Sequence, residues 1–560
     1  RMPMPAGAGG WHEVEVGEVD STTRYAFRID GRLLLPDPAS RCNPDGVHGP
    51  SRVVDPAAWR WSDGGWRGRP WHEAVIYELH VGAFTPEGSF AAAIGKLDEL
   101  AALGVTALEL MPVAAFSGRH GWGYDGVLPF APHAAYGAPE DLKRLVDEAH
   151  ARGLMVLLDV VYNHFGPDGN YLHAYAPQFF NPRHRTPWGA AINFDGEASR
   201  TVRDFFIHNA LYWLTEYHLD GLRVDAVHAI ADGSPLHFVE ELAVAVRAGP
   251  GRERHVHLVL ENDGNAARLL PRAADGAPRL ADAQWNDDVH HAAHVLATGE
   301  RDGYYADFAG EPLRLFGRAL AEGFAWQGEP SPFRDGRRRG EASAHLPPVA
   351  FVDFLQTHDQ VGNRAFGERL CHLADEAPLR ALAACVLLAP AVPMLFMGEE
   401  FAAGSPFLYF CDYRGDLAQA VTAGRRSEFG RFARFADPAV RDRIPDPNDP
   451  ATFARSCLDW GERSRGAHAR WLALHGELLA IRRQRLVPLL PRVRSGRYSA
   501  DAGVLAVRWP IGDGGALHLL ANLAAQSAAR EPAPGEVLYA SHPMDGRLPP
   551  WSVRWSLESA

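Results

Sequence analysis

Eight short apolar segments, separated by segments that can form helices, constrain the fold of this 560-residue chain more than any other feature. Two of the intervening segments, 89–104 and 138–153, have helical composition, and the second has Pro139 near its start and Gly153 at its end. Apolar strands that alternate with helices indicate a parallel sheet covered on both faces. Eight such units predict a closed (β/α)8 TIM barrel. The eight segments are residues 74–81, 105–113, 154–164, 220–228, 256–262, 281–287, 350–359 and 392–400.

An open, doubly wound α/β sheet is the alternative arrangement of the same elements. Such sheets often carry a glycine-rich GxGxxG turn after the first strand, where a dinucleotide phosphate binds. No such turn follows the first apolar segment, 74–81, so the barrel is favoured.

The pattern of the chain changes at both ends of the predicted barrel. Residues 1–70 contain short alternating stretches separated by Gly, Pro and Asp, which predict a small N-terminal β-sandwich domain. The barrel domain is expected over 71–485, with an insertion at 165–200 after the third strand that is rich in Pro, Asn, His and aromatic residues. Alternation returns over 486–560 and predicts a C-terminal antiparallel β domain.

Composition excludes several classes of partner. The formal net charge is −13 at pH 7, and no basic block offsets it, which argues against nucleic acid and anionic membranes. The densest basic run, RDGRRRG at 334–340, contains several glycines and predicts a solvated loop. No apolar run is long enough to span a membrane, and no signal peptide is apparent at the start. The five cysteines lack CxxC spacing and are odd in number, so we expect a cytoplasmic protein without disulfides.

Polar residues gather where the predicted strands end. In a parallel barrel these ends open onto one face, which is the face where barrel enzymes place their active sites. We therefore expect them to form a single ring of functional side chains. Its members are Asp159, Asn163, His164, Arg223, Asp225, His228, Glu261, Asn286, Asp287, His358 and Asp359.

Three acids of this ring, Asp225, Glu261 and Asp359, lie on three different strands and suggest glycoside hydrolysis, which needs two carboxyl groups that flank the bond to be cut. Arg223 lies two residues before Asp225, on the same side of a strand, and its charge favours the ionised form of that acid. Glu261 follows an apolar run, so burial should raise its pKa toward that of a general acid. An ordinary ion pair would explain a single acid such as Asp159, but not three acids on one rim.

Other catalytic motifs are absent from the sequence. His290 and His294 have the spacing of a zinc-binding helix, but the glutamate of an HExxH motif is missing, and the helix surface is the simpler interpretation. Neither a GxSxG motif nor a P-loop occurs, which argues against serine hydrolases and common nucleotide-binding enzymes. The sequence therefore predicts neither a metal site nor a cofactor.

Four aromatic residues lie near the predicted rim and are candidate platforms for sugar rings, with core packing as the alternative. Glycines surround Tyr124 in GWGYDG, which predicts an exposed turn for this residue. The four aromatic residues are Trp122, Tyr124, Trp188 and Trp285.

Four segments resemble, in order, the signature regions of the α-amylase-type retaining glycoside hydrolases. They are DVVYNH at 159–164, GLRVDAVH at 221–228, LEND at 260–263 and FLQTHDQVGN at 354–363. The resemblance implies a (β/α)8 barrel, a small domain after the third strand and a C-terminal β domain.

The resemblance also implies roles for individual residues. Asp225 corresponds to the nucleophile, Glu261 to the acid/base and Asp359 to the carboxylate that stabilises the transition state. Arg223, His164 and His358 would hold the sugar at the cleavage position, and Tyr124 would stack on it. The residues expected to bind substrate are Tyr124, His164, Arg223, His228, Trp285, Asn286, Asp287, Asp288, His290, His358, Gln360 and Asn363.

Further segments are similar to one group of this family, the maltooligosyltrehalose trehalohydrolases. This group cuts the α-1,4 bond next to a terminal trehalose unit, so the resemblance implies maltooligosyltrehalose, or another α-1,4-glucan oligosaccharide, as substrate. His228 and the segment 286–290 would then lie on the leaving-group side. The similar segments are residues 77–90, 284–300, 356–364, 396–401 and 452–460.

Glycogen branching enzymes and general α-amylases are the nearest alternatives. Branching enzymes usually have an acid pair in the third signature and SHDE-like residues in the fourth, whereas this chain has END at 261–263 and THDQ at 357–360. A sugar-binding relative without activity is a third possibility, but Asp225, Glu261 and Asp359 are all present.

Overall fold

The computed structural model describes residues 1–560 except residues 187, 431, 436, 513, 532, 545 and 560, and the side chains at 9 and 433. Eight parallel strands close into a barrel, each within one of the eight apolar segments, so the predicted barrel is confirmed. The strands follow one another around the barrel in chain order. They are β5 (Ile76–Leu79), β6 (Ala107–Leu110), β9 (Met155–Val160), β12 (Gly221–Val224), β13 (His257–Leu260), β14 (Ala283–Trp285), β17 (Phe351–Asp353) and β18 (Val392–Phe396).

Helices connect successive strands and pack outside the barrel. The predicted helix at 138–153 is α4, Pro139–Ala151, with Pro139 in its first turn and the Asp141 carboxylate accepting a hydrogen bond from the Ala138 amide. The predicted helix at 89–104 is instead two shorter helices that break at Gly95. The other helices that flank the barrel are α2 (Phe90–Ile94), α3 (Leu97–Leu103), α6 (Ser199–Glu216), α7 (Phe238–Ala248), α8 (Asp287–Thr298), α9 (Pro312–Glu322), α12 (Glu376–Leu387) and α16 (Gly466–Ile481).

Alternation along each strand decides what lies inside the barrel. Ile76, Ala107 and Leu157 belong to one apolar cluster that fills the lower interior. Because side chains alternate in direction, the residues two positions further along point inward at the upper end. These residues are polar: Glu78, Glu109, Asp159 and, by the same parity, Arg223 and Glu261.

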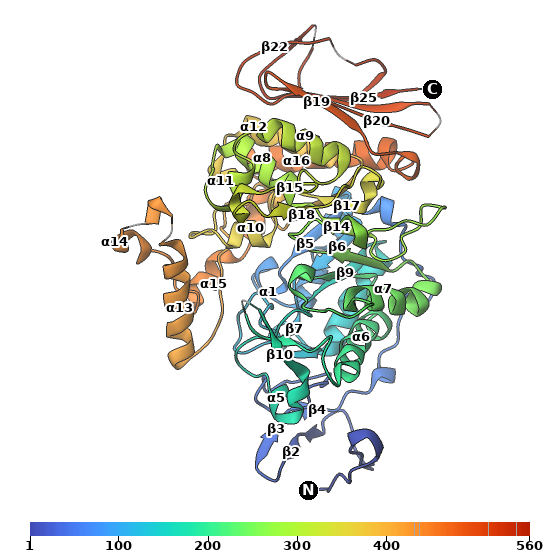
Figure 1. The fold of residues 1–560 in the computed structure, drawn as a ribbon, viewed down its shortest axis with the longest axis vertical. Helices are drawn as coiled ribbons and strands as arrows, with labels where there is room; N and C mark the ends of the chain where they lie inside the picture. The colour runs from blue at the N-terminus through green and yellow to red at the C-terminus, as the bar shows by residue number, and fades with distance from the viewer. Residues whose placement is uncertain are drawn as a thin grey trace.

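A five-stranded antiparallel sheet forms the C-terminal part of the chain and confirms the predicted β domain. It packs on α9 and α12 at one end of the molecule (Figure 1). Trp509 and Trp555 stack on each other at this contact, with ring centroids 5.4 Å apart. In spatial order the strands are β19 (Arg497–Asp501), β20 (Val504–Pro510), β21 (Ala516–Asn522), β25 (Ser552–Glu558) and β23 (Glu536–Ala540).

The N-terminal sandwich is not confirmed. Residues 1–70 contain two small antiparallel pairs, at the opposite end of the molecule from the C-terminal sheet (Figure 1). The predicted domain limits at 70 and 485 stay predictions. The pairs join β1 (Arg24–Tyr25) to β4 (Ser51–Arg52) and β2 (Phe27–Ile29) to β3 (Leu33–Leu35).

The segment after β9 contains a further hairpin, of β10 (Phe180–Thr186) and β11 (Gly189–Ile192), before α6 begins. The predicted limits of the insertion, 165–200, stay a prediction. Within the described part of the chain, no helix is long and apolar enough to cross a membrane.

Candidate active site

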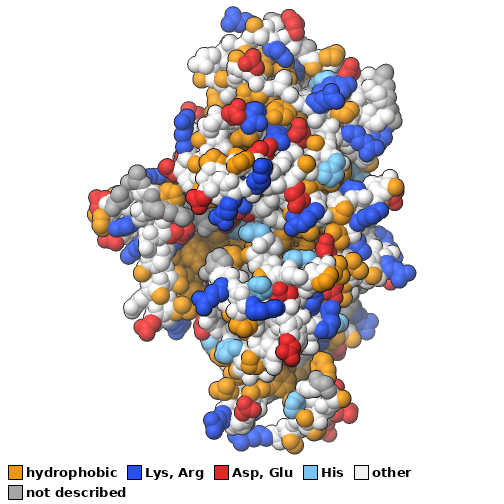
Figure 2. Space-filling model, viewed as in Figure 1, with side chains coloured by type: hydrophobic (Ala, Val, Ile, Leu, Met, Phe, Trp, Pro, Cys, Tyr) orange, Lys and Arg blue, Asp and Glu red, His pale blue; other side chains and the backbone are white. Residues whose placement is uncertain are grey.

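A cleft of about 480 Å³ lies over the C-terminal ends of the barrel strands. On the face shown in Figure 2, the middle of the molecule is hollowed, and several His side chains lie around the hollow. The three predicted carboxylates, Asp225, Glu261 and Asp359, all line the cleft. Strand ends that are distant in the sequence thus meet at one site, as the parallel barrel requires.

Arg223 is at the centre of the charged network on the floor of the cleft. Its Nη1 donates to Oδ1 of Asp225 and to Oδ2 of Asp159, both at 2.7 Å. Asn163 donates from Nδ2 to Asp225 Oδ2 at 2.8 Å, so both carboxylate oxygens of Asp225 accept hydrogen bonds. These bonds fix the orientation of Asp225.

Glu261 follows β13 and differs from Asp225 in its electrostatic environment. Its Oε2 accepts a hydrogen bond from the Ala226 amide at 2.7 Å, and Nη2 of Arg223 lies 3.9 Å away. Burial raises the pKa of Glu261 well above its ordinary value; Arg223 opposes this shift and Asp225 adds to it. The two acids therefore have different environments: two side-chain donors hold Asp225, whereas burial favours the protonated form of Glu261.

Asp359 lies in the short helix α10 (His358–Gly362), where its Oδ1 accepts a hydrogen bond from Asn363 Nδ2 at 2.6 Å. Burial raises the pKa of Asp359. Both the backbone amide and Nδ1 of the neighbouring His358 bond to the Glu78 carboxylate. Burial lowers the pKa of His358, but the Glu78 charge outweighs this effect and the net shift is upward.

Aromatic rings surround the three acids. Tyr124 is half-buried rather than on an exposed turn, because its hydroxyl donates to Asp159 at 2.5 Å and its ring stacks on His358. Trp188 stacks on His164, with centroids 4.7 Å apart, and remains 49% exposed. Trp285 is buried beneath the Arg223 guanidinium, 4.1 Å from its ring centroid. Of these three rings, Trp188 is the most exposed at the cleft.

Most other predicted binding residues also line the cleft, including His228, Asp287 and Gln360. Gln360 donates from Nε2 to Asp287 Oδ1 at 3.2 Å, and burial raises the pKa of Asp287 to about 7. The predicted residues that line the cleft are Tyr124, His164, Arg223, His228, Trp285, Asp287, His358, Gln360 and Asn363.

Three predicted binding residues do not line the cleft. Asn286 bonds to Gly323 and Asp353, and Asp288 accepts from the Ala325 and Trp326 amides, so both side chains belong to the buried packing of the wall. His290 bonds to Leu355 O and to the Tyr305 hydroxyl. His291, the next residue along α8, lines the cleft instead.

The prediction of a solvated loop at 334–340 holds for residues 335–338, which are exposed, but not for Arg334 and Arg339. Arg334 and Arg339 both line the cleft, and the Arg339 side chain is only 3% exposed because it pairs with Asp288 at 2.8 Å. The basic residues and glycines of this run were the only signals in the sequence, and they do not reveal that Arg339 has an acidic partner in a distant segment. The other cleft residues that sequence reasoning missed are Asp125, Asp263, Tyr304, Asp307, Phe333 and Tyr409.

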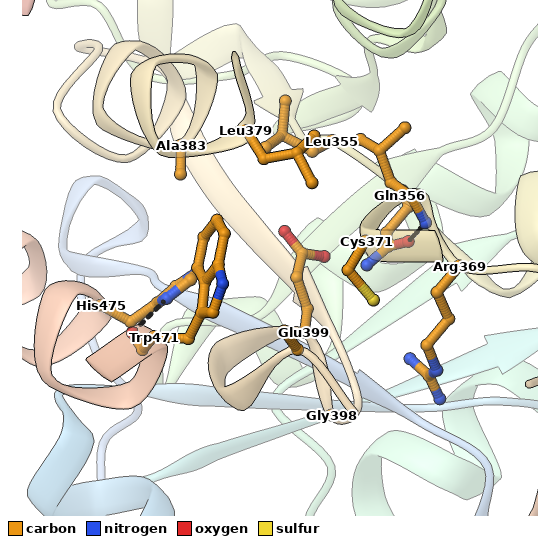
Figure 3. Close-up of a pocket in the computed structure, with 12 residues that line it drawn as sticks. Leu355, Gln356, Arg369, Cys371, Leu379, Ala383, Gly398, Glu399, Trp471 and His475 are labelled. Carbon is orange, nitrogen blue, oxygen red and sulfur yellow. Dashed lines mark hydrogen bonds between the residues drawn. The ribbon is translucent and has the colours of Figure 1, made fainter. Parts of the chain in front are cut away.

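A second cavity, of about 30 Å³, is lined by Gly398 and Glu399 of the turn after β18 and by side chains of α12 and α16 (Figure 3). Glu399 points into it beside Gln356, Cys371 and Trp471 (Figure 3). It shares no lining residue with the cleft and has the volume of about one water molecule.

Two parts of the chain match family models, and most of its length matches known proteins. Residues 34–208 match the model of the alpha amylase catalytic domain, and residues 493–555 match a domain of unknown function designated DUF3459. The chain is 48% identical over 489 residues to the malto-oligosyltrehalose trehalohydrolase of Arthrobacter ramosus. This alignment covers 86% of this chain and 83% of the relative. It is 28% identical to a 1,4-alpha-glucan branching enzyme of Nocardia farcinica, over 71% of this chain and 54% of that enzyme.

Among solved structures, a Salmonella typhimurium protein described as an alpha amylase superposes with a TM-score of 0.95 at 48% identity. The match covers 99% of this chain and 94% of that one. A pullulanase from Paenibacillus barengoltzii, at 19% identity and a TM-score of 0.69, shares the fold. From its identity to the Arthrobacter ramosus relative over most of both sequences, we conclude that the chain belongs to the malto-oligosyltrehalose trehalohydrolase family of alpha-amylase-type glycoside hydrolases.

Proposed function

We propose that this protein hydrolyses the α-1,4-glucosidic bond next to the terminal trehalose unit of maltooligosyltrehalose and releases trehalose. The observation that carries the mechanism is the contrast between Asp225, which accepts hydrogen bonds from Arg223 and Asn163, and Glu261, whose pKa burial raises. Relatives named for this activity, at 40–48% identity, support the choice of substrate.

Asp225 is the proposed nucleophile and Glu261 the proposed acid/base. The Glu261 carboxyl donates its proton to the glycosidic oxygen while Asp225 attacks the anomeric carbon, so the sugar becomes bonded to Asp225 and trehalose leaves. The Glu261 carboxylate then takes a proton from water, which attacks the same carbon and releases Asp225. Two displacements retain the configuration, and we expect the two carboxyl groups to lie about 5–5.5 Å apart.

The remaining residues around the acids position the sugar that is attacked. We propose that Asp359 and His358 bond to its hydroxyl groups, and that the ring of Tyr124 covers one of its faces. Tyr124 is held for this purpose by its bond to Asp159 and by stacking on His358. We also propose a cytoplasmic location, which suits the five free cysteines.

Product analysis tests this function. Purified protein is incubated with maltotriosyltrehalose and, separately, with maltopentaose, which has the same number of glucose units, and the products are separated by chromatography. We expect fast trehalose release and slow cleavage of maltopentaose. Equal cleavage of both would indicate a general α-amylase, and new α-1,6 branches on a longer glucan would indicate a branching enzyme.

A further inference from the structure

The C-terminal sheet has an outer face, which points away from the barrel and has no part in the mechanism above. Trp509 points toward α9, so the residues that alternate with it along β20 point outward. A short antiparallel pair, β22 (Ala528–Ala529) with β24 (Arg547–Leu548), lies on this face, where Leu548 packs with Leu520 of β21 (Figure 1). A groove of about 350 Å³ is lined by the outer face and by the segment that follows β22.

A row of basic side chains crosses the outer face at this groove. Arg497 on β19 lies directly opposite Arg508 on β20, and Arg508 lies directly opposite His518 on β21. Directly opposite residues of an antiparallel pair point to the same side, where like charges are unfavourable. Arg530, which follows β22, lines the same groove. Three guanidinium groups therefore surround one hollow in the surface.

Glu558, at the end of β25, compensates only part of this charge. Its Oε2 accepts a hydrogen bond from Nε2 of His518 at 2.9 Å. The same oxygen lies 3.8 Å from Nη2 of Arg508, which is too far for a hydrogen bond. The Arg508 side chain remains 51% exposed. Its guanidinium is therefore accessible to a ligand in the groove.

The other two arginines, Arg497 and Arg530, have less compensation. Neither forms an ion pair or a side-chain hydrogen bond with a described residue, and Glu531, which also lines the groove, forms no ion pair with one either. Asp501 shares the face of Arg497 but lies four residues further along β19, about 13 Å away in an extended strand. Positive charge is therefore in excess at the groove, on a chain whose net charge is −13.

The chemistry and size of the groove indicate the class of ligand. A planar guanidinium presents paired N–H donors that match two oxygens of a phosphate group, and three such groups suit a doubly charged phosphate better than a carboxylate. The volume of the groove lies at the lower end of the range for small-molecule sites, about 300–1,000 Å³. Ser499, Ala506 and Leu520 add a hydroxyl group and apolar surface. The groove thus has room for a phosphate group joined to a small organic body.

We propose that the outer face of the C-terminal sheet binds a small phosphate-bearing molecule, inorganic phosphate or a sugar phosphate, with its phosphate group between Arg497, Arg508 and Arg530. The bound anion offsets the repulsion between the opposed arginines, so binding stabilises the sheet. The groove shares no lining residue with the catalytic cleft, and this inference goes beyond the proposed function without depending on it.

Titration calorimetry on the full chain at constant ionic strength tests the site with inorganic phosphate, glucose 6-phosphate and glucose. We expect both phosphates to bind, and Arg497→Gln and Arg508→Gln each to weaken this binding about tenfold or more. Any heat from glucose should be the same in these variants as in the unchanged protein. Arg252→Gln, which replaces an exposed arginine outside the groove, is the matched control. Tighter binding of glucose 6-phosphate identifies a sugar phosphate as the ligand, and equal affinity identifies the phosphate ion.

Thermal unfolding provides a second measurement on the same proteins. In phosphate-free buffer, Arg497→Gln should raise Tm, because it removes one of two opposed like charges. Added phosphate should raise the Tm of the unchanged protein more than that of either groove variant. Arg497 and Arg508 are exposed, so both replacements are compatible with folding, and Arg508→Lys, which keeps the charge, is a further variant.

Two outcomes would overturn the inference: no binding of either phosphate, or affinities of both groove variants within about twofold of the unchanged protein. The release of trehalose from maltotriosyltrehalose is measured separately, so a failure of the proposed function and a failure of this site are distinguishable.

Discussion

Arg223 shows how a single residue sets the electrostatics of the cleft. It bonds to Asp225 and Asp159, lies near Glu261, and rests on the face of Trp285. Residues two positions apart in a strand point to the same side, so the opposite charges of Arg223 and Asp225 were enough to predict this pair. Asp159 joins the pair because β9 and β12 are neighbours in register, with Asp159 opposite Arg223.

Replacement of the two proposed catalytic acids should separate chemistry from binding. We expect Glu261→Gln and Asp225→Asn each to lower kcat by about 10²–10⁴-fold with KM little changed, because the lost groups act on the reacting bond. Initial-rate kinetics on maltotriosyltrehalose measures both constants. Glu253→Gln, an exposed acid outside the cleft, is the control. Near-normal turnover in either variant would refute the assigned role.

The pH dependence of activity follows from the raised pKa of Glu261. Glu261 must be protonated to donate to the leaving group, so kcat/KM should fall as pH rises through this raised pKa, well above the ordinary range of a glutamate. A pH profile of kcat/KM measures the alkaline limb. An alkaline limb near the ordinary pKa of glutamate would show that burial does not keep Glu261 protonated.

Glu109 offers a test of charge inside the barrel. Neither of its carboxyl oxygens has a hydrogen-bond partner among the described residues, and burial together with the nearby Glu78 raises its pKa well above the ordinary value. This shift favours the neutral form of Glu109, so Glu109→Gln should change the free energy of unfolding by less than about 1 kcal/mol.

Glu78→Gln is the matched comparison, because Glu78 lies opposite Glu109 on the neighbouring strand but pairs with His358. Loss of a hydrogen bond to a charged group should cost about 1.5–3 kcal/mol and lower activity. Urea unfolding and kcat measure the two effects. Equal damage from both replacements would mean that Glu109 is ionised.

At the scale of elements, the turn after β18 should respond to pH. Burial raises the pKa of Glu399 to about 8 and that of Glu400 to about 7. Both acids are neutral in the folded state and ionise at lower pH when unfolded. The stability that they contribute is therefore complete below about pH 4.5 and is lost as pH rises toward 7–8.

Glu399→Gln removes one of these ionisations in the cavity of Figure 3. We expect its free energy of unfolding to fall less steeply than that of the unchanged protein between pH 5 and pH 8, by on the order of a few kcal/mol. Urea denaturation at several pH values measures the slope. Parallel slopes would show that Glu399 titrates normally in the folded protein.

At the scale of the whole molecule, the C-terminal sheet is joined to the barrel through buried tryptophans. Trp555 donates from Nε1 to Ala384 O of α12 at 3.0 Å, and Trp509 donates to Leu320 O of α9 at 3.2 Å. Both rings are fully buried. The C-terminal sheet therefore packs on α9 and α12, which lie outside the barrel.

Trp555→Ala should lower the free energy of unfolding by about 3–5 kcal/mol, because it leaves a large void at this contact. Trp555 is not a cleft residue, so kcat at 25 °C should stay unchanged while the protein remains folded. Calorimetry and initial rates measure the two quantities, and Trp555→Phe should have a smaller effect. A loss of kcat larger than the loss of folded protein would show that the sheet acts on the cleft.

The eight strands, the barrel and the place of the three carboxylates could be predicted from the amino-acid order, because apolar runs and strand ends are local properties and a closed parallel barrel brings the strand ends to one face. The choice of neighbouring side chains that reach the cleft depends instead on the packing of segments that are distant in the chain. One step along α8 turns the chain by about 100°, which buries His290 and presents His291. Arg339 is buried because Asp288, distant in the chain, pairs with it, and such long-range pairing has no local signal in the sequence.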